Sequence, residues 1–424
     1  MNKIFIYLLT GLLVLGLLAC AQPVAGEVVK SEKRRVTNPS TSQADLSELV
    51  SGNTAFAFDL YQLINTDDEN IFYSPYSISA ALAMVYAGAR GTTEQQMNQA
   101  LHFNLPQERL HPAFNSLDIE LNKRGEGAKG KDDKGFRLNI VNAIWGQKDY
   151  TFLASFLDTL AENYGAGLRV LDFINSPESS RVTINKWVSD QTEGKIKDLI
   201  PQGMIDSLTR LVLTNAIYFN AAWQHPFNKS VTQEEPFYLL SGGQVSVPMM
   251  RITEPFGYSE GAGYQAVEIP YDGRELSMIV ILPSEGQFKS FEGSLDAQNV
   301  GTIIDNLQSK QVDLSLPKFE FESSLNLKQT LIKLGMPEAF SDHADFSGIT
   351  GNKELSITDV VHKAFVSVDE EGTEAAAATA VIVGLTSAPA MPISVKVDRP
   401  FIFLIRDMET GAILFVGRVM NPGK

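Results

Sequence analysis

The chain has 424 residues, 44% of them hydrophobic and 20% charged, which is the composition of a globular protein with enough apolar surface for a large core. This composition excludes disorder over most of the length, and the single cysteine excludes a disulfide framework. The 50 acidic and 35 basic residues give a formal net charge of −15, which argues against general binding to nucleic acid or to anionic lipid headgroups.

Residues 1–19 predict an export signal. A weakly basic start precedes an apolar run over residues 4–18, which is too short to indicate a membrane span. The Leu-Leu-Ala-Cys sequence that ends at Cys20 resembles the lipobox of prokaryotic lipoproteins. We therefore predict a signal peptide over residues 1–19 and lipidation of Cys20, which would make this a membrane-anchored lipoprotein of the cell envelope. An ordinary secretory signal that ends near Ala19 or Ala25 is the alternative.

Residues 20–50 predict a flexible, lipid-anchored tether. They contain Pro23, Gly26, Pro39 and a charged cluster at residues 31–35, and they show no apolar periodicity. A tether of this length would let the folded domain stand clear of a membrane.

The globular pattern begins at about Ser51, where apolar residues at helical spacing predict the first helix. Residues 70–84 then predict a short strand, a turn at Pro75 and a buried helix whose cap is Ser74 or Ser77. A catalytic serine would need a Gly-x-Ser-x-Gly elbow, and neither serine has one.

Residues 125–130 match the dinucleotide pattern Gly-x-Gly-x-x-Gly, but they follow a charged segment rather than an apolar strand. We interpret them as a solvated loop, and the acids between the nearby lysines disfavour a polyanion site.

Long apolar runs predict strands at residues 136–145 and 211–223, and an amphipathic helix lies between them at residues 184–196. Two further strands are predicted at residues 264–271 and 276–283, the first amphipathic and the second fully buried.

Nothing in the sequence specifies an enzyme. The histidines lack the His-Glu-x-x-His spacing and there is no cysteine pair, so no zinc site is predicted. Asp342, His343 and Asp345 are better explained as a turn with an aspartate cap. We expect no metal, no cofactor and no catalytic residue.

Residues 370–380 allow two interpretations. Thr373 is an acceptable helix N-cap and is followed by an alanine run, which favours a helix. In the alternating pattern of a strand, Glu374 falls on the opposite face from Thr373, and Gly372 offers a permissive hinge. The face that starts at Thr373 is then uncharged, small at one end and β-branched at the other, as a buried sheet requires. Its members are Thr373, Ala375, Ala377, Thr379, Val381 and Val383.

The segments around this run favour the strand. With residues 361–369 upstream and residues 398–406 and 411–419 downstream, the arrangement resembles the hinge, reactive-centre loop and C-terminal signature of the serpins. The likeness extends from about Ser51 to Asn421, with several motifs in the right order. It implies an α+β serpin domain over residues 51–424, with three β-sheets and about eight to nine helices.

The resemblance also implies roles for single residues. Residues 370–394 would form the hinge and the exposed reactive-centre loop, and Trp223 would lie in the breach, where the loop first enters the central sheet. Asn220 and Ala221 replace the basic residue and glycine usual before that tryptophan. The shutter, beneath the opening of the sheet, would contain Ser74, Pro75, Ser77, Asn185 and His362. The hinge would contain Glu370, Gly372, Thr373, Glu374, Ala375, Ala376, Ala377, Ala378 and Thr379.

The spacing typical of serpins makes Thr386, the seventeenth residue counted from Glu370, the bait residue. The reactive bond is then Thr386–Ser387, and Leu385 is the alternative bait residue. Neither residue is basic, so the predicted targets are elastase-, chymotrypsin- or subtilisin-like serine endopeptidases rather than trypsin-like ones.

These features predict an irreversible suicide-substrate inhibitor. The cleaved loop would insert into the central sheet and trap the protease as an acyl-enzyme. The expected partner is a target serine protease in a covalent complex. The protein is expected to be a monomer that contacts membranes only through Cys20 and binds no nucleic acid. A non-inhibitory serpin acting as a binding or carrier protein, and an inhibitor of a cysteine protease, are the alternatives.

Overall fold

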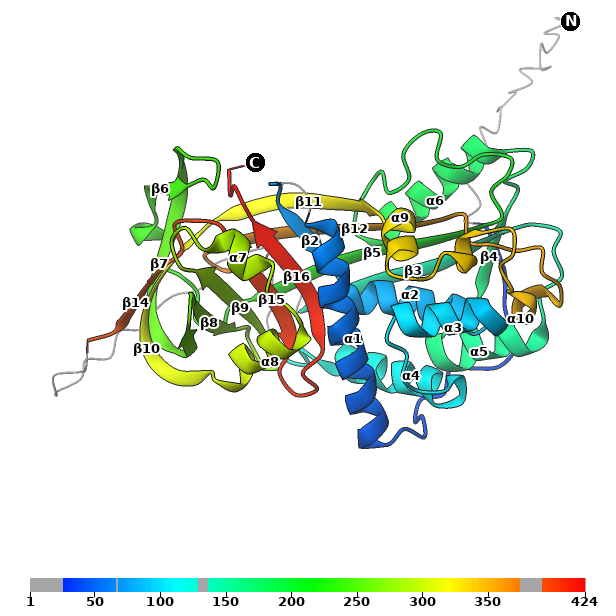
Figure 1. Ribbon diagram of the computed structural model, residues 1–424, viewed down its shortest axis with the longest axis horizontal. Helices are drawn as coiled ribbons and strands as arrows, with labels where there is room; N and C mark the ends of the chain where they lie inside the picture. Colours follow the sequence, from blue (N-terminus) through cyan, green and yellow to red (C-terminus); the bar gives the residue numbers. More distant parts are fainter. Residues whose placement is uncertain (1–25, 66–67, 129–135, 374–390, 424) are drawn as a thin grey trace, which may run out of the picture.

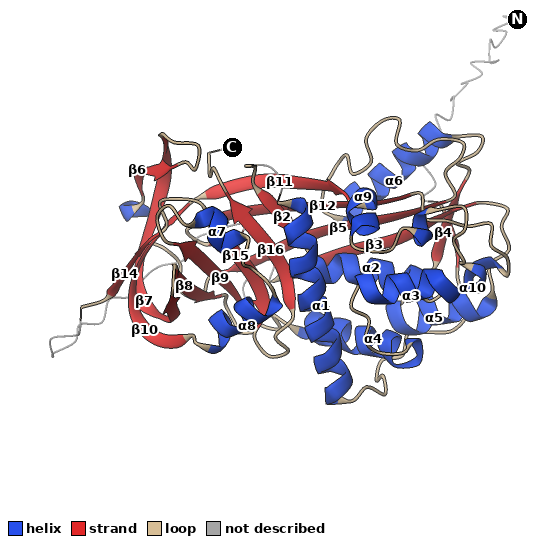
Figure 2. Ribbon diagram, viewed as in Figure 1, coloured by secondary structure: helices blue, strands red, loops and turns tan. Residues whose placement is uncertain are grey.

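The computed structural model describes residues 26–65, 68–128, 136–373 and 391–423. Two large β-sheets run through the molecule, and helices gather beside them (Figures 1 and 2). The helices are α1 (Gln43–Ile64), α2 (Pro75–Tyr86), α3 (Gly91–Ala100), α4 (Gln107–Lys123), α5 (Ala154–Tyr164), α6 (Pro177–Gln191), α7 (Phe288–Glu292), α8 (Ala297–Asp305), α9 (Lys328–Lys333) and α10 (Ser347–Thr350).

Sheet A has seven strands among the described residues. Their spatial order is β1 (Glu27–Val29), β4 (Leu168–Leu171), β3 (Arg137–Gln147), β5 (Leu211–Ala222), β13 (Gly372–Thr373), β12 (Asp359–Asp369) and β11 (Phe319–Asn326). The long strands predicted at residues 136–145 and 211–223 are confirmed as β3 and β5.

Sheet B has nine strands among the described residues. They are β14 (Ile393–Lys396), β10 (Gln308–Pro317), β7 (Gln244–Gly261), β8 (Tyr264–Pro270), β9 (Leu276–Pro283), β15 (Phe401–Asp407), β16 (Ile413–Val419) and β2 (Ile71–Tyr73), with β6 (Gln233–Tyr238) paired to β7.

The predicted α+β fold is confirmed. The 18 residues of β7 pair with β6, β10 and β8 in turn, so these strands form one hydrogen-bonded array. The described residues contain ten α-helices, of which α7, α9 and α10 are short segments of four to six residues. None of these helices is long and apolar enough to cross a membrane.

Sheet A is covered on both faces. Val141 and Trp145 of β3 pack with Ile184 of α6 in a small core on one face, whereas Ile144 and Leu213 belong to the large core on the other. Because successive side chains of a strand point to opposite faces, a strand covered on both sides must be apolar along its whole length. This explains why the sequence of β5 shows a nearly continuous apolar run.

The predicted flexible tether over residues 20–50 is wrong for its described part, which starts at Gly26. Residues 27–29 form β1, which pairs antiparallel with β4 at the edge of sheet A. The guanidinium group of Arg35 then donates hydrogen bonds to Asn115 (2.8 Å) and Asp118 (2.6 Å). The arm, as we call residues 26–42, is therefore packed on the domain. A short polar segment has no periodicity that would reveal such tertiary partners.

The first helix also begins earlier than predicted. Ser42 caps α1 by accepting a hydrogen bond from the amide of Asp45, whose carboxylate accepts one from the amide of Ser42. This reciprocal capping box satisfies two amides at the start of the helix. The expected boundary at Ser51 consequently falls inside α1, and the folded unit includes residues before it.

Candidate functional site

The hinge segment enters sheet A as a short strand. Strand β13 lies between β5 and β12, with Thr373 opposite Ala221 on one side and Val368 on the other. Thr373 is 1% exposed, and its Oγ1 lies 2.9 Å from the hydroxyl oxygen of Tyr271. Thr373 and Gly372 thus follow the strand interpretation of the sequence.

The other predicted loop positions lie outside the described residues. These are Glu374, Ala375, Ala376, Ala377, Ala378 and Thr379 of the hinge, and Leu385, Thr386 and Ser387 around the predicted reactive bond.

Two buried glutamates hold the turn between β12 and β13. The carboxylate of Glu370 accepts hydrogen bonds from Lys318 and Thr232, both at 2.8 Å, and Glu371 forms an ion pair with Lys229. Burial of the Glu370 carboxyl opposes its ionisation, but these hydrogen bonds outweigh burial and hold its pKa below the usual value. The turn is therefore fixed by charge-assisted contacts to neighbouring segments.

Gly372 sits where the backbones come closest. Its φ is +155°, and a Cβ at this position would lie 2.1 Å from the carbonyl oxygen of Ala221. Any other residue would force the two strands apart. The absence of a Cβ at position 372 is thus a requirement of the pairing of β13 with β5.

Trp223 closes the same end of sheet A. Its indole Nε1 donates a hydrogen bond to the carbonyl of Asp369 (2.9 Å), and its amide donates one to the carbonyl of Glu371 (2.8 Å). The indole also stacks on the ring of Tyr271, with centroids 4.6 Å apart. Trp223 therefore supports the turn that leads into β13.

A buried polar network lies in the middle of sheet A. The backbone amide of Ser74, at the start of α2, donates to Nε2 of His362 on β12 (3.2 Å). Nδ1 of the same ring contacts the amide oxygen of Asn215 on β5, and the Asn215 amide nitrogen donates to Ser77 and to Asn142 of β3. The network thus joins three neighbouring strands to the N-terminus of α2.

The contacts determine the protonation of His362. Because Nε2 accepts a hydrogen bond, the ring proton is on Nδ1 and is donated to Asn215. Burial lowers the pKa of His362 to about 3, so the ring is neutral at physiological pH.

The network lies where β5 and β12 of sheet A pair directly with each other. Strands β5 and β12 pair directly, and in parallel, over six residue pairs from Asp359–Val212 to Ala364–Ile217. Asn215 and His362 form one of these pairs, so the polar network spans the seam between β5 and β12. Above this seam, β13 occupies the space between the same two strands.

A strand that enters a sheet between two strands, above a closed seam, is the arrangement expected of a loop-inserting inhibitor. The family model described as Serpin (serine protease inhibitor) matches residues 51–422. The chain belongs to the serpin family.

Individual serpins are similar over most of their length. Human leukocyte elastase inhibitor is 41% identical over 390 residues, which are 89% of this chain and 100% of that protein. The thermophilic serpin tengpin in its native state has a TM-score of 0.81 with 30% identity, covering 93% of this chain and 97% of that one. Human thyroxine-binding globulin complexed with its hormone has a TM-score of 0.80 with 33% identity, covering 89% and 99%.

The residues assigned to the serpin shutter do not all meet. Ser74 and Ser77 converge with His362, and Pro75 is the first residue of α2. Asn185 does not join them, and its assignment to the shutter is wrong. It lies on α6, where its side chain bonds both the amide and the carbonyl of Ile200 (2.8 and 2.9 Å).

Asn215 takes the place that the sequence analysis gave to Asn185, and Asn142 is a further member that it missed. Both are asparagines in predicted apolar strands, and they lie opposite each other in the β3–β5 register. A polar residue in a run that is buried on both faces needs a partner. This rule predicts from the sequence that Asn215 has a hydrogen-bond partner, but it does not predict which residue that partner is.

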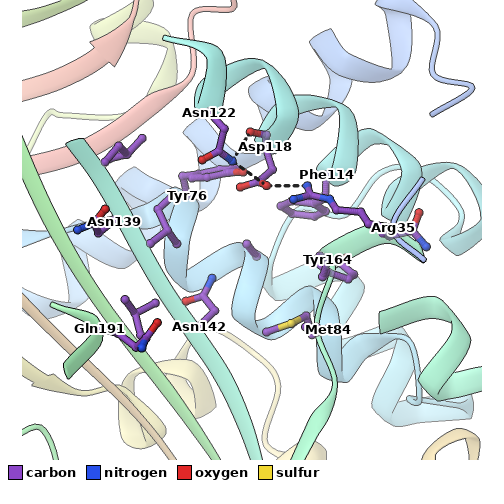
Figure 3. A pocket seen from close by; sticks show the side chains of 16 residues that line it. Arg35, Tyr76, Met84, Phe114, Asp118, Asn122, Asn139, Asn142, Tyr164 and Gln191 are labelled. Carbon is purple, nitrogen blue, oxygen red and sulfur yellow. Dashed lines mark hydrogen bonds and ion pairs between the residues drawn. The ribbon is translucent and has the colours of Figure 1, made fainter. Parts of the chain in front are cut away.

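A cavity of about 380 Å³ lies beside this network, between β3, α2 and α4. Figure 3 shows Asn142 at its wall, with Arg35 of the arm reaching across to Asp118 of α4. Asn142 therefore contacts both the cavity and the polar network of the shutter.

The stability of the native form should depend on pH through His362. An unfolded histidine titrates near pH 6.5, whereas the folded His362 has a pKa of about 3, so protons favour unfolding as pH falls from 6.5 towards 3. We expect the difference in unfolding free energy between the native protein and His362→Gln to shrink by about 2 kcal/mol from pH 7 to pH 5. Urea unfolding at both pH values measures it, and a constant difference would contradict the neutral assignment.

The charge of Glu370 should hold β13 in place. Glu370→Gln keeps the shape but removes the ion pair with Lys318, at a cost of about 1.5–3 kcal/mol. We expect amide hydrogen exchange at Gly372 and Thr373 to accelerate by roughly tenfold or more. The matched control is Glu322→Gln, which removes a more exposed ion pair with Lys363 in the same sheet and should leave these amides unchanged.

Proposed function

We propose that this serpin is an irreversible suicide-substrate inhibitor of serine endopeptidases of the elastase, chymotrypsin or subtilisin type. The observation that carries the proposal is the position of β13. The hinge already lies in sheet A between β5 and β12, directly above the seam that a longer inserted strand would open.

The sequence that follows β13 suits insertion. Continuing the antiparallel register, in which Thr373 faces Ala221, would place Val383 opposite Leu211 at the far end of β5. The thirteen residues from Thr373 to Leu385 would extend about 43 Å as a strand. The side chains on the face of Thr373 are small or β-branched and uncharged, so burying them needs no compensating partner.

The chemistry is an interrupted peptide hydrolysis. The serine hydroxyl of the protease attacks the carbonyl carbon of Thr386, and the amine of Ser387 leaves with the proton relayed by the catalytic histidine of the protease. The product is an ester between Thr386 and the protease. Insertion of the freed segment would carry this ester away from the loop end before water completes the hydrolysis.

The inserted strand would pair with a neighbour on both sides, which should give the inserted form the lower free energy. The uninserted form is therefore expected to persist only because a kinetic barrier separates the two forms. The similarity to leukocyte elastase inhibitor supports a target with a small or apolar specificity pocket, as Thr386 and Leu385 also suggest.

The test mixes the full chain with pancreatic-type elastase, chymotrypsin and subtilisin. The full chain is used because residues 27–50 pack on the domain. We expect a denaturant-resistant band at the summed mass and a released fragment that begins at Ser387. A fragment that begins at Thr386 would make Leu385 the bait residue.

Two other results would replace the proposal. If every serine protease cleaves the loop and stays active while a papain-like enzyme is trapped, the target is a cysteine protease. If no protease is trapped, the similarity to thyroxine-binding globulin favours a non-inhibitory binding or carrier protein.

We also propose that the mature protein is a lipoprotein of the cell envelope, anchored through Cys20. The support is the Leu-Leu-Ala-Cys sequence at the end of the apolar segment. Metabolic labelling with an alkyne fatty acid should mark the native protein but not Cys20→Ala, and equal labelling of both would exclude this anchor.

A further inference from the structure

The arm begins at the end of sheet A opposite to the hinge. Glu27 of β1 pairs with Val170 of β4, which is level with Gly146 of β3 and with Leu211, the first residue of β5. The described chain therefore begins at this end of the sheet, with Gly26 packed beside Leu171 of β4.

The hinge lies at the other end. Thr373 faces Ala221, ten residues along β5 from Leu211, which corresponds to about 33 Å of strand. Figure 1 shows the same separation: β4 lies at one end of the long axis, and β14, which follows the reactive-centre segment, lies at the other.

Exposed apolar side chains lie at both ends of sheet A, with Tyr238, Leu240 and Met391 near β6 and β14 and three others at the end where the arm begins. Leu208, just before β5, is 75% exposed, Ile174, just after β4, is 43% exposed, and Val28 of β1 is 40% exposed. Because single exposed apolar side chains are normal on a protein surface, the short chain to Cys20, rather than these side chains, is what favours lipid contact at this end. We call the surface formed by Val28, Ile174 and Leu208 the anchor pole.

Only five residues separate Cys20 from Gly26, where the described arm begins. Six peptide steps span at most about 20 Å. A lipid on Cys20 would therefore hold the anchor pole close to a bilayer, unlike the long tether that the sequence had suggested.

We infer that, in the anchored protein, the anchor pole faces the lipid bilayer and the hinge points away from it, so that loop insertion carries the trapped protease onto the bilayer surface. This inference rests on the proposed lipidation and on the proposed inhibitory mechanism. In the antiparallel register, Thr386 would finish three residues beyond Leu211, which is level with Glu27.

The geometry leaves little room for the protease. A protease domain of about 230 residues has a radius of gyration of about 17 Å, so it is wider than the gap of about 20 Å that the tether allows. The trapped enzyme must therefore touch the bilayer or tilt the serpin. Lengthening the segment between Cys20 and Gly26 would relieve this constraint.

The orientation is tested first, with the lipidated full chain in phosphatidylcholine vesicles that carry a headgroup quencher. Leu208→Cys places a fluorescent label on the anchor pole, and Leu240→Cys, in the turn after β6, places one on a less exposed leucine near the opposite end. We expect at least threefold stronger quenching of the label at position 208. Equal quenching, stronger quenching at position 240, or failure to bind the vesicles would overturn the inference.

The movement is tested with a donor-labelled elastase and acceptor-labelled lipid headgroups. Energy transfer should be low for an elastase whose catalytic serine is replaced by alanine, held at the intact loop, and should rise at least twofold in the covalent complex. A variant with twenty Gly/Ser residues inserted after Ala21 should lose most of that rise.

The two proposals fail in different ways. A covalent band on gels without a rise in transfer overturns the movement onto the bilayer but leaves inhibition intact. Absence of the band overturns the inhibitory function and the movement together, while the quenching experiment still decides the orientation.

Discussion

Replacing Thr373 with arginine will abolish covalent trapping and turn the protein into a substrate. Thr373 is buried between β5 and β12 and contacts the hydroxyl group of Tyr271. A guanidinium group in that position would have no anionic partner, and an unpaired buried charge costs several kcal/mol. Insertion would then be slower than hydrolysis of the acyl-enzyme. Active-site titration should show at least a hundredfold fall in the fraction of encounters that end in a covalent complex.

The matched control is Thr373→Val. Valine keeps the β-branched shape and loses only the contact with Tyr271, so trapping should persist within a few-fold of the native protein. If Thr373→Arg still forms the covalent complex in full yield, insertion through β13 is not the mechanism of inhibition.

Replacing Asn215 with alanine will open the closed seam of sheet A. The side chain accepts from His362 and donates to Ser77 and Asn142, all in a buried site. Its removal leaves buried Nδ1 of His362 without its acceptor, at a cost of about 1–3 kcal/mol, and takes one hydrogen bond each from Ser77 and Asn142, which still bond each other. We expect the unfolding free energy of the native form to fall by about 3 kcal/mol or more. Inhibitory activity should also decay within hours at 37 °C, because the loop inserts without a protease.

Asn185→Ala is the control, since Asn185 is also a buried asparagine but bonds only the backbone of Ile200. It should lower stability by about 1–2 kcal/mol without speeding the loss of activity. Urea unfolding and timed activity assays separate the two variants. Similar activity decay in both would show that general stability, rather than the network at the seam, protects the native form.

From residues 370–380 alone the alanine run favours a helix, and only the flanking segments that resemble serpins favour the strand. Of this run the structure describes Gly372 and Thr373 as strand β13, whereas the alternating residues from Ala375 to Val383 lie outside the described residues, so the strand stays a prediction there. The resemblance of the same segments to serpins identified the fold. The continuous apolar run of β5 predicted a strand that is covered on both faces.

Contacts between distant polar residues could not be predicted in the same way. The partners of Arg35 lie 80 or more positions away in α4, and nothing in the local pattern of the arm points to them. Asn185 and Asn215 are equivalent as isolated asparagines, and only the strand register brings the latter to His362. The tether and the shutter were mispredicted because side-chain chemistry does not specify which surfaces meet.

The position of β13 also determines how sheet A can open. Among the described residues, direct pairs between β5 and β12 end at Ala364 and Ile217, and β13 pairs with both strands above that point. The junction is a branch point. An incoming strand there replaces one residue pair between β5 and β12 with two pairs, one to each strand, as in strand exchange between nucleic acids. If the loop inserts as proposed, this branch point offers a starting place without a new nucleus. The branch point must then pass the pair formed by Asn215 and His362 before the new strand can extend further between β5 and β12.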